Sequence, residues 1–246
     1  MHLNIFKIGG NVIDNPQKLE TFLDTFCRCQ EKKILVHGGG KLASELSEQL
    51  GLKVRMEQGR RITDSMTLRV AVMVYAGWVN KNLVSSLMTR ECRALGLSGA
   101  DGRCIITRKR DPEPVDFGYV GDITDSSVDA VFIQKLLNDG LVPVFSSVTC
   151  DNSGQLLNTN ADTVASALAL AFRSIYTVRL RFIFDKEGVC CPGSDRPLPL
   201  LSRTQYEKLR CQDIVSGGMI PKIENALRAL ERGIEEVYIG NTYIQL

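Results

Sequence analysis

The sequence predicts an α/β fold with helices on both faces of a mainly parallel central sheet, an αβα three-layer sandwich. Two short apolar segments, 3–8 and 34–36, are each followed by a glycine-rich loop and then by a helical pattern. The helical patterns run through 19–26 and 42–50, and Gly51 closes the second one. Strand, glycine loop and helix in this repeated order are typical of a parallel sheet.

The composition is that of an ordinary globular protein. The chain has 246 residues, 44% hydrophobic content, 24% charged content and a formal net charge of +2. So small a charge gives no reason to expect bulk attraction to nucleic acid. The sequence has no apolar run long enough to cross a bilayer and no secretory signal at its amino terminus. We therefore expect a cytoplasmic protein without a nucleic acid or membrane partner.

Cysteine and histidine usage gives little support to a disulfide framework or a metal site. The eight cysteines are scattered, none forms a CxxC pair, and the two histidines are His2 and His37. A zinc site needs a cluster of such ligands at fixed spacing. We expect free, partly buried thiols in a reducing cytosol and no metal ligand from the protein.

The two glycine loops, 7–11 and 37–41, lie where the carboxyl end of a strand meets the amino end of a helix. Open α/β sheets bind ligands at this edge, because free backbone amides converge there. Neither loop is a GxGxxG fingerprint or a GxxxxGK[ST] phosphate loop. Each is weak evidence alone, and together they point to a phosphate or carboxylate site.

The segment 58–64 brings two adjacent arginines close to the start of a long helical stretch. A guanidinium holds a carboxylate through two parallel hydrogen bonds, which lysine cannot do. Thr63 or Asp64 is a plausible cap for the helix beyond. The stretch 66–90 has a broad apolar surface, so it packs either against a second copy of the chain or within the core.

The middle of the chain is predicted to form smaller elements. Residues 103–125 are expected to form an antiparallel hairpin over one end of the sheet, and 128–137 a helix. Buried strands follow at 141–148 and, with alternating polar residues, at 176–184. The alternation in 176–184 suits an edge strand or a strand with one solvated face. A last strand is expected at 237–240.

Polar side chains alternate at Asn158, Asn160 and Asp162 before an alanine-rich helix that continues to Phe172. In an extended segment, alternation puts all three on one side. Asn160 or Asp162 can also cap the helix. A cap accounts for one of these residues, so we predict a functional role for at least one of the three.

The stretch 217–222, Gly-Gly-Met-Ile-Pro-Lys, runs into a further helical pattern. The glycines allow close approach to a ligand, and Pro221 suits the first turn of a helix. Lys222 adds an ammonium where the amides already attract anions. A bound anion would account for this arrangement; a glycine turn with a solvated lysine is the alternative.

These motifs resemble the amino acid kinase family and, within it, the acetylglutamate kinases. They occur in the family's order and span nearly the whole chain, at 7–10, 37–40, 59–63, 76–77, 80–81, 158–162 and 217–222. The first two belong to the family broadly. The blocks Gly-Arg-Arg-Ile-Thr, Asn-x-Asn-Ala-Asp and Gly-Met-Ile-Pro-Lys are similar to those of the acetylglutamate branch.

The resemblance implies transfer of the γ-phosphoryl group of ATP, with Mg²⁺, to the side-chain carboxylate of N-acetyl-L-glutamate. The product would be an acyl phosphate of arginine biosynthesis. Three alternatives stay open: another N-acylglutamate such as N-succinyl-L-glutamate, another acceptor within the family, or a catalytically silent ligand-binding protein. The silent class should have lost a catalytic lysine, and both lysines are present here.

The same resemblance implies roles for individual residues. Lys7 and Lys222 would flank the transferring phosphoryl group, and Asp162 would orient both lysines. The acceptor carboxylate is already ionised near neutral pH, so no general base is needed. The residues expected to bind the acceptor are Gly39, Gly40, Arg61 for the α-carboxylate and Asn158 for the acylamino group. Those expected at the nucleotide are Lys7, Gly9, Gly10, Asp185, Gly188, Ile214, Val215, Ser216 and Lys222.

Two departures from the family pattern modify these expectations. Phe184 stands where the family commonly has a hydroxyl residue before the nucleotide-binding turn. The first strand begins almost at Met1, which leaves no room for the additional amino-terminal helix of arginine-inhibited hexameric relatives. We expect a homodimer without arginine feedback, with acylglutamate binding and dimerisation in a lobe at 1–165 and ATP binding in a lobe at 166–246.

Overall fold

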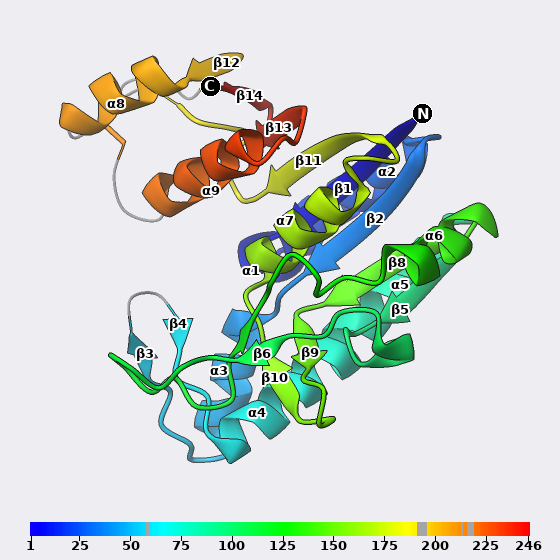
Figure 1. The fold of residues 1–246 in the computed structure, drawn as a ribbon, viewed down its shortest axis with the longest axis vertical. Helices are drawn as coiled ribbons and strands as arrows, with labels where there is room; N and C mark the ends of the chain where they lie inside the picture. The colour runs from blue at the N-terminus through cyan, green and yellow to red at the C-terminus, as the bar shows by residue number, and fades with distance from the viewer. Residues whose placement is uncertain (58–59, 191–195, 213, 216–218) are drawn as a thin grey trace.

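An eight-stranded sheet forms the centre of the described part of the chain (Figure 1). The computed structural model describes residues 1–57, 60–190, 196–212, 214–215 and 219–246. The strand order is β12-β14-β13-β11-β1-β2-β8-β5, and among the pairs only β13–β14 is antiparallel within this sheet of described residues. The strands are β1 (His2–Ile8), β2 (Lys32–His37), β5 (Ala94–Leu97), β8 (Val142–Ser146), β11 (Thr177–Ile183), β12 (Leu200–Ser202), β13 (Glu236–Ile239) and β14 (Thr242–Gln245). The predicted fold class is confirmed.

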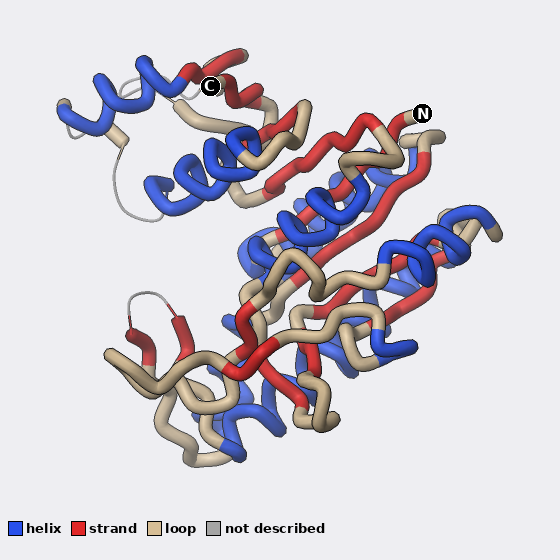
Figure 2. Tube along the Cα trace, viewed as in Figure 1, coloured by secondary structure: helices blue, strands red, loops and turns tan. Residues whose placement is uncertain are grey.

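Helices cover both faces of the sheet, as Figure 2 shows for the whole trace. They are α1 (Gly10–Ile13), α2 (Pro16–Arg28), α3 (Gly40–Gln49), α4 (Ser65–Ala71), the π-helix η1 (Val72–Val79), α5 (Asn80–Met88), the 3₁₀-helix η2 (Asp101–Arg103), α6 (Ala130–Asn138), α7 (Ala161–Phe172), α8 (Arg203–Cys211) and α9 (Met219–Glu231). None of these helices is long and apolar enough to cross a membrane.

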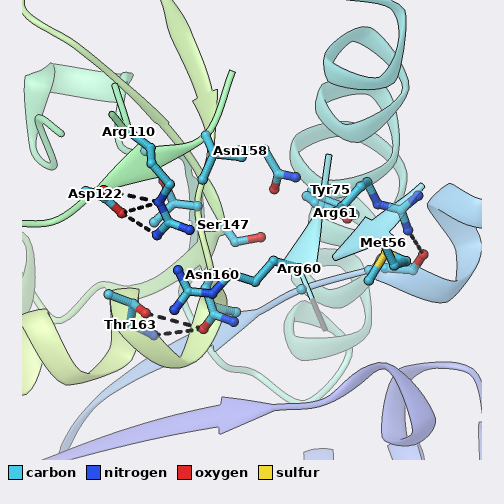
Figure 3. Close-up of a pocket in the computed structure, with 17 residues that line it drawn as sticks. Met56, Arg60, Arg61, Tyr75, Arg110, Asp122, Ser147, Asn158, Asn160 and Thr163 are labelled. Atoms are coloured by element: carbon cyan, nitrogen blue, oxygen red, sulfur yellow. Dashed lines mark hydrogen bonds and ion pairs between the residues drawn. The ribbon is translucent and has the colours of Figure 1, made fainter. Parts of the chain in front are cut away.

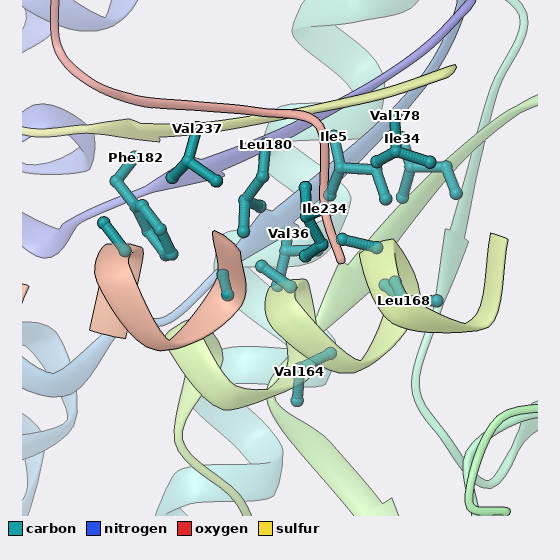
Figure 4. Packing of buried hydrophobic residues seen from close by; sticks show 14 of the residues in the cluster. Ile5, Ile34, Val36, Val164, Leu168, Val178, Leu180, Phe182, Ile234 and Val237 are labelled. Carbon is teal, nitrogen blue, oxygen red and sulfur yellow. The ribbon is translucent and has the colours of Figure 1, made fainter. Parts of the chain in front are cut away.

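One face of the sheet packs against α6, α7 and α9 (Figure 4). Ile5 and Val36 from the inner strands are fully buried there, beneath Val164 and Leu168 of α7. Successive strand side chains point to opposite faces, so each inner strand supplies both cores. On this face the burial of aliphatic side chains fixes α7 over the strand ends that carry the glycine loops.

The other face packs against α2, α5 and η1. Phe6 of β1 meets Phe26 of α2 edge to face, with ring centroids 5.1 Å apart. Alternating sides of β1 therefore serve the two cores, because Phe6 and Ile8 face α2 whereas Ile5 faces α7. This is the three-layer arrangement expected from the sequence.

Of the two alternatives predicted for β11, the structure supports the second. β11 lies between β1 and β13 rather than at an edge, and one of its sides is partly solvated. Arg179 on that side is paired with Glu236 and Glu31. The prediction that β13 is the last strand was wrong, since the antiparallel β14 follows it and carries the sheet on to β12.

Three small two-stranded sheets lie beyond the carboxyl ends of the central strands (Figure 1). They pair β3 (Met56–Glu57) with β4 (Arg60–Arg61), β6 (Arg108–Lys109) with β7 (Gly121–Asp122), and β9 (Val148–Cys150) with β10 (Leu156–Asn158). The hairpin expected within 103–125 is thus present as β6–β7. The strand expected at 141–148 is divided, because β8 ends at Ser146 and β9 begins at Val148.

The helical stretch expected at 66–90 is α4, η1 and α5 in continuous succession. Asp64 caps α4, since its carboxylate accepts a hydrogen bond from the Thr67 amide at 2.8 Å. Val70 and Val74 are buried, whereas Trp78 is 67% exposed. The stretch therefore contributes both to the core and to an apolar outer surface.

Candidate active site

The second glycine loop lies between β2 and α3 and is fitted closely to η1. A Cβ atom on Gly39 would lie 2.8 Å from Cδ1 of Tyr75 and 3.3 Å from a methyl group of Val79. Contacts this short exclude any side chain at that position. The glycine expected at the acceptor is therefore also required by packing, which holds the loop backbone against the π-helix.

His37, at the end of β2, holds the same loop in place through a hydrogen bond to Gly38. Its ring is fully buried, and burial lowers the pKa of His37 to about 4, so the ring is neutral near pH 7. The Nδ1–H group donates to the carbonyl of Gly38 at 2.8 Å, and Nε2 accepts from the Asn80 amide at 3.0 Å. Asn80 also donates to the carbonyl of Val144. The sequence singled out both residues within motifs but gave them no role.

Lys7, at the carboxyl end of β1, is paired with Asp162. Its Nζ lies 2.8 Å from a carboxylate oxygen of Asp162, and both side chains are largely buried. Asp162 lies in the first turn of α7, where Asn160 is the N-cap and accepts hydrogen bonds from the amides of Asp162 and Thr163. The predicted alternation thus fails at Asp162, because the helix begins at Ala161 and turns that carboxylate towards Lys7.

Lys222 lies in the first turn of α9, with its Nζ 4.8 Å from the centroid of the Phe184 ring. Burial lowers the pKa of Lys222, the positive charge of Lys7 lowers it further, and the carboxylate of Asp162 opposes both effects. The structure therefore brings Lys7, Lys222 and Asp162 into one electrostatic group. The preceding Gly217 and Gly218 lie outside the described residues.

A cavity of about 230 Å³ is lined in part by Ala161 and Thr163, the two neighbours of Asp162 in the chain (Figure 3). Loops and small sheets from the 1–165 part of the chain surround it. Its lining residues are Gly38, Gly39, Gly40, Met56, Arg60, Arg61, Tyr75, Arg110, Val120, Gly121, Asp122, Ser147, Asn158, Thr159, Asn160, Ala161 and Thr163. The four residues expected to bind the acceptor are all among them.

Arg61 is the most enclosed charge at the cavity, with 9% of its surface exposed. Its Nη2 donates to the carbonyl of Gly40 at 2.8 Å and to the hydroxyl of Ser44 at 2.7 Å. Its Nη1 is buried and has no hydrogen-bond partner among the described residues. A buried charged donor without a partner is costly, so this nitrogen is suited to a ligand anion.

Asn158, at the end of β10, presents an amide to the same cavity. Its Nδ2 donates to the Thr63 hydroxyl at 3.1 Å, which fixes the orientation of the amide. Thr63 is buried and belongs to the segment that carries Arg61. Asn158 and Arg61 are thus held by neighbouring backbone although they lie far apart in the sequence.

The residues expected at the nucleotide form a separate group. Gly9 and Gly10 follow β1, next to Lys7, and Gly9 donates to the carbonyl of Ile183 at 3.1 Å. Asp185 follows β11, and its carbonyl accepts a hydrogen bond from Lys18. None of the described members of this group lines the cavity, and Ser216 lies outside the described residues.

Two of the residues predicted to bind the nucleotide also have structural roles. A Cβ atom on Gly188 would lie 2.6 Å from the Thr242 hydroxyl, so packing against β14 already requires glycine there. Val215 is buried in the core on the α9 face, which leaves only its backbone for a ligand, whereas its neighbour Ile214 is half-buried.

The sequence did not predict that Arg60, Arg110 and Asp122 also line the cavity. Arg110 directly follows β6 and Asp122 is the last residue of β7, and the guanidinium donates to the carboxylate through Nε and Nη2. The only signal in the sequence was the pair of adjacent arginines at 60 and 61. Nothing local indicated that the hairpin would bring a third arginine to the same cavity.

Comparison with known proteins gives matches along the whole chain. Residues 3–241 match the amino acid kinase family. An acetylglutamate kinase of Cytophaga hutchinsonii is 43% identical over 240 residues, which cover 96% of this chain and 90% of that protein. An acetylglutamate kinase of Bacteroides fragilis is 41% identical, covering 96% and 91%. One from Methanopyrus kandleri is 41% identical over 246 residues, covering 97% and 95%.

Solved structures share the fold at lower identity. An N-acetylglutamate synthase from Neisseria gonorrhoeae, complexed with coenzyme A and N-acetyl-glutamate, superposes with a TM-score of 0.81 at 19% identity, covering 99% of this chain and 59% of that chain. Aspartokinase III of Escherichia coli, in complex with aspartate and ADP, gives 0.68 at 12% identity, covering 99% and 65%. At these identities the likeness shows the architecture and nothing further.

Proposed function

This chain belongs to the amino acid kinase family, and we propose that its cavity and lysine pair carry out the acetylglutamate kinase reaction. The chain transfers the γ-phosphoryl group of ATP to the side-chain carboxylate of N-acetyl-L-glutamate, a step of arginine biosynthesis. Full-length relatives from bacteria and from Methanopyrus kandleri, all named acetylglutamate kinase, support this reaction. The resemblance inferred from the sequence motifs is thereby confirmed.

The observation that carries the site assignment is the cluster of Lys7, Lys222 and Asp162 beside a cavity with an unpartnered arginine nitrogen. Phosphoryl transfer needs little covalent help from the protein, only alignment and compensation of charge on the moving oxygens. Two ammonium groups that repel each other in the free protein supply that compensation once phosphates lie between them. Asp162 keeps both in place without serving as a base.

In the proposed step, an oxygen of the acceptor carboxylate forms a bond to the γ-phosphorus of ATP. The bond from that phosphorus to the bridging oxygen breaks, and its electron pair stays on ADP. The carboxylate is already ionised near neutral pH, so no proton leaves it. Lys7 and Lys222 would stabilise the charge that spreads over the transferring oxygens.

On the acceptor side, Arg61 would bind the α-carboxylate through the nitrogen that has no partner among the described residues. Asn158 would hold the acylamino group, since its amide is fixed by Thr63 and faces the cavity. Gly39 and Gly40 would present backbone amides to the acceptor. These placements leave the reacting carboxylate at the end of the cavity nearest Asn160 and α7.

On the donor side, Gly9 and Gly10 would present amides to the phosphates of ATP beside Lys7. Asp185, Gly188, Ile214, Val215 and Ser216 stay our predicted contacts for the rest of the nucleotide. The described residues hold no group of three or more histidine, cysteine or acidic side chains suited to a metal. Mg²⁺ would be held mainly by phosphate oxygens and water, where it neutralises negative charge.

A coupled ADP-release assay tests this function directly. N-acetyl-L-glutamate should support turnover, whereas free L-glutamate, L-aspartate and carbamate should not. Turnover on carbamate or aspartate with none on the acylated amino acid would reject the assignment.

The division into lobes at 1–165 and 166–246 and the cytoplasmic location stay predictions.

We also propose that two copies of the chain associate through α4, η1 and α5. Large apolar side chains are exposed along this stretch, including Met73 at 52%, Trp78 at 67% and Met88 at 64%. Exposed apolar groups concentrated on one segment are typical of an interaction surface. Light scattering should give a dimer that Trp78→Glu weakens; a monomeric or hexameric wild type would contradict this proposal.

A further inference from the structure

The side chain of Tyr75 forms part of the cavity wall next to the second glycine loop. Tyr75 belongs to the π-helix η1, is 5% exposed and lines the cavity. π-helical turns are frequent at functional sites. The loop fixes one edge of the ring, since a Cβ atom on Gly39 would lie 2.8 Å from Cδ1 and 3.2 Å from Cε1. Close packing against the loop backbone thus holds the ring in one position.

The hydroxyl of Tyr75 lies at the same glycine that anchors Arg61. A Cβ atom on Gly40 would lie 3.9 Å from the hydroxyl oxygen, and the Gly40 carbonyl accepts the hydrogen bond from Nη2 of Arg61 at 2.8 Å. Figure 3 shows the two side chains together at the cavity. Burial raises the pKa of Tyr75, and the charge of Arg61 opposes this rise because the groups are neighbours. The hydroxyl therefore keeps its proton near pH 7.

The hydroxyl proton of Tyr75 has no acceptor within the described part of the chain. The neighbouring guanidinium has only donors, so Arg61 can donate to the hydroxyl oxygen but cannot accept its proton. Nη1 of Arg61 is a second donor in the same place that is buried and unpartnered among the described residues. A carboxylate, with two oxygens that each accept hydrogen bonds, would satisfy both donors at once.

We propose that Tyr75 is a second binding residue for the α-carboxylate of the acceptor, to which its hydroxyl donates a hydrogen bond beside Nη1 of Arg61. This inference rests on the proposed function, in which Arg61 binds that carboxylate. It adds a residue that determines specificity for N-acyl amino acids over carboxylic acids without an α-carboxylate. Leucine or phenylalanine would fill the same space but would leave one oxygen of the α-carboxylate without this donor.

Tyr75→Phe tests the proposal, because it keeps the ring that packs on Gly39 and removes only the hydroxyl. The KM for N-acetyl-L-glutamate should rise by roughly tenfold, the usual effect of losing a hydrogen bond to a charged group. The kcat and the KM for ATP should stay at their wild-type values. Tyr243→Phe is the matched control, because it removes a hydroxyl from β14, outside the cavity, and should change none of these constants.

A ligand without the α-carboxylate separates binding of that group from a general effect on the cavity. N-acetyl-γ-aminobutyrate has the acylamino group and the distal carboxylate of N-acetyl-L-glutamate but lacks the α-carboxylate. As a competitive inhibitor, it should have the same inhibition constant for wild type and for Tyr75→Phe.

Tyrosine absorption of the wild type gives a reading that needs no variant. A phenol that donates to a carboxylate absorbs at longer wavelength than one that does not. Binding of N-acetyl-L-glutamate should therefore shift the tyrosine band to longer wavelength, whereas N-acetyl-γ-aminobutyrate should not.

Three results would overturn the inference. One is an unchanged KM for N-acetyl-L-glutamate in a folded Tyr75→Phe variant. Another is equal weakening of N-acetyl-L-glutamate and N-acetyl-γ-aminobutyrate in that variant, which would limit Tyr75 to shaping the cavity. The third is the same tyrosine difference spectrum with both ligands.

Turnover of N-acetyl-L-glutamate by the wild type separates this inference from the proposed function. If the wild type phosphorylates this compound and Tyr75→Phe has the same KM for it, only the inference fails. If the wild type phosphorylates carbamate or aspartate instead, the proposed function fails and the inference with it.

Discussion

The cavity proposed for the acceptor and the side of the site proposed for the nucleotide differ in how much of their geometry the protein itself fixes. In the cavity, Arg61 is anchored on Gly40 and Ser44, and Asn158 is anchored on Thr63. On the nucleotide side, Lys222 rests on the ring of Phe184 and is repelled by Lys7. The side chains of the first half are thus held by hydrogen bonds within the protein, whereas Lys222 in the second half faces a like charge, which phosphates would offset under the proposed function.

Lys7 and Lys222 likewise differ in whether the protein supplies a counter-ion. Lys7 has a carboxylate partner at 2.8 Å, whereas no ion pair to Lys222 is found among the described residues. A desolvated ammonium without a close counter-ion favours an anionic ligand. We therefore expect substitutions on the two sides to affect different kinetic constants.

The largest effect is expected for Lys7→Ala. It removes the ammonium that we propose lies at the phosphoryl group and also leaves the Asp162 carboxylate without its partner. We expect a loss of about 3 kcal/mol in transition-state stabilisation, seen as a fall in kcat of about a hundredfold. Steady-state kinetics with N-acetyl-L-glutamate measures it.

Lys135→Ala, on the exposed side of α6, is the matched control and should leave kcat unchanged. Thermal unfolding should show that Lys7→Ala stays folded. A folded Lys7→Ala variant with normal turnover would remove Lys7 from the chemistry.

The next effect concerns the cavity proposed for the acceptor and depends on pH. Burial holds the pKa of His37 at about 4, compared with 6.5 for an ordinary histidine. As the pH falls through 6.5, His37 in the unfolded chain becomes protonated, whereas the buried ring in the native state stays neutral until about pH 4. The contribution of His37 to stability is therefore full above pH 6.5 and lost on the way down to pH 4, by about 3 kcal/mol in total.

Urea unfolding of wild type and His37→Gln between pH 7.5 and 4.5 measures this effect. The wild type should lose more stability across this range than the variant does. Parallel curves for the two proteins would mean that His37 takes up its proton equally readily in the native and unfolded states, and that the glycine loop does not depend on a neutral ring.

Arg61→Lys should give the third effect, confined to the acceptor. Lysine keeps the charge but cannot bridge Gly40, Ser44 and a carboxylate at once. We expect the KM for N-acetyl-L-glutamate to rise by about tenfold, or roughly 1.4 kcal/mol. An altered KM for ATP with an unchanged KM for the acceptor would move Arg61 to the other side of the site.

Much of the fold could be predicted because its signals are local. The Asp64 cap, the apolar strands β1 and β2 and the glycine loops all follow from a few neighbouring residues. The position of β11 could not be predicted in this way. Its alternating arginines suited either an edge strand or a strand with one solvated face, and the sequence could not decide between them. In the structure, Glu236 and Glu31 pair with Arg179 and allow a central strand to keep one polar face.

The site shows the same limit. Lys7, Asp162 and Lys222 were proposed from family motifs, and the structure brings them together. The meeting of Arg60 with Arg110 and Asp122 depends on how two hairpins fold over the sheet edge, which no local pattern encodes. The neutral His37 was missed for a related reason, because its state depends on complete burial.

The smallest expected effect sharpens the comparison on the nucleotide side. Phe184 stands where the family commonly has a hydroxyl residue, and its ring lies under the ammonium of Lys222. Phe184→Leu keeps the apolar volume but removes the attraction between cation and ring, which is about 1 kcal/mol at a half-buried site. Phe184→Tyr keeps it. If the ring positions Lys222 for phosphate, Phe184→Leu should lower kcat/KM for ATP by about fivefold while the KM for the acceptor stays constant, and Phe184→Tyr should match wild type. Equal losses in both variants would show that this position is sensitive to shape, and that Lys222 is positioned by the nucleotide rather than by the ring.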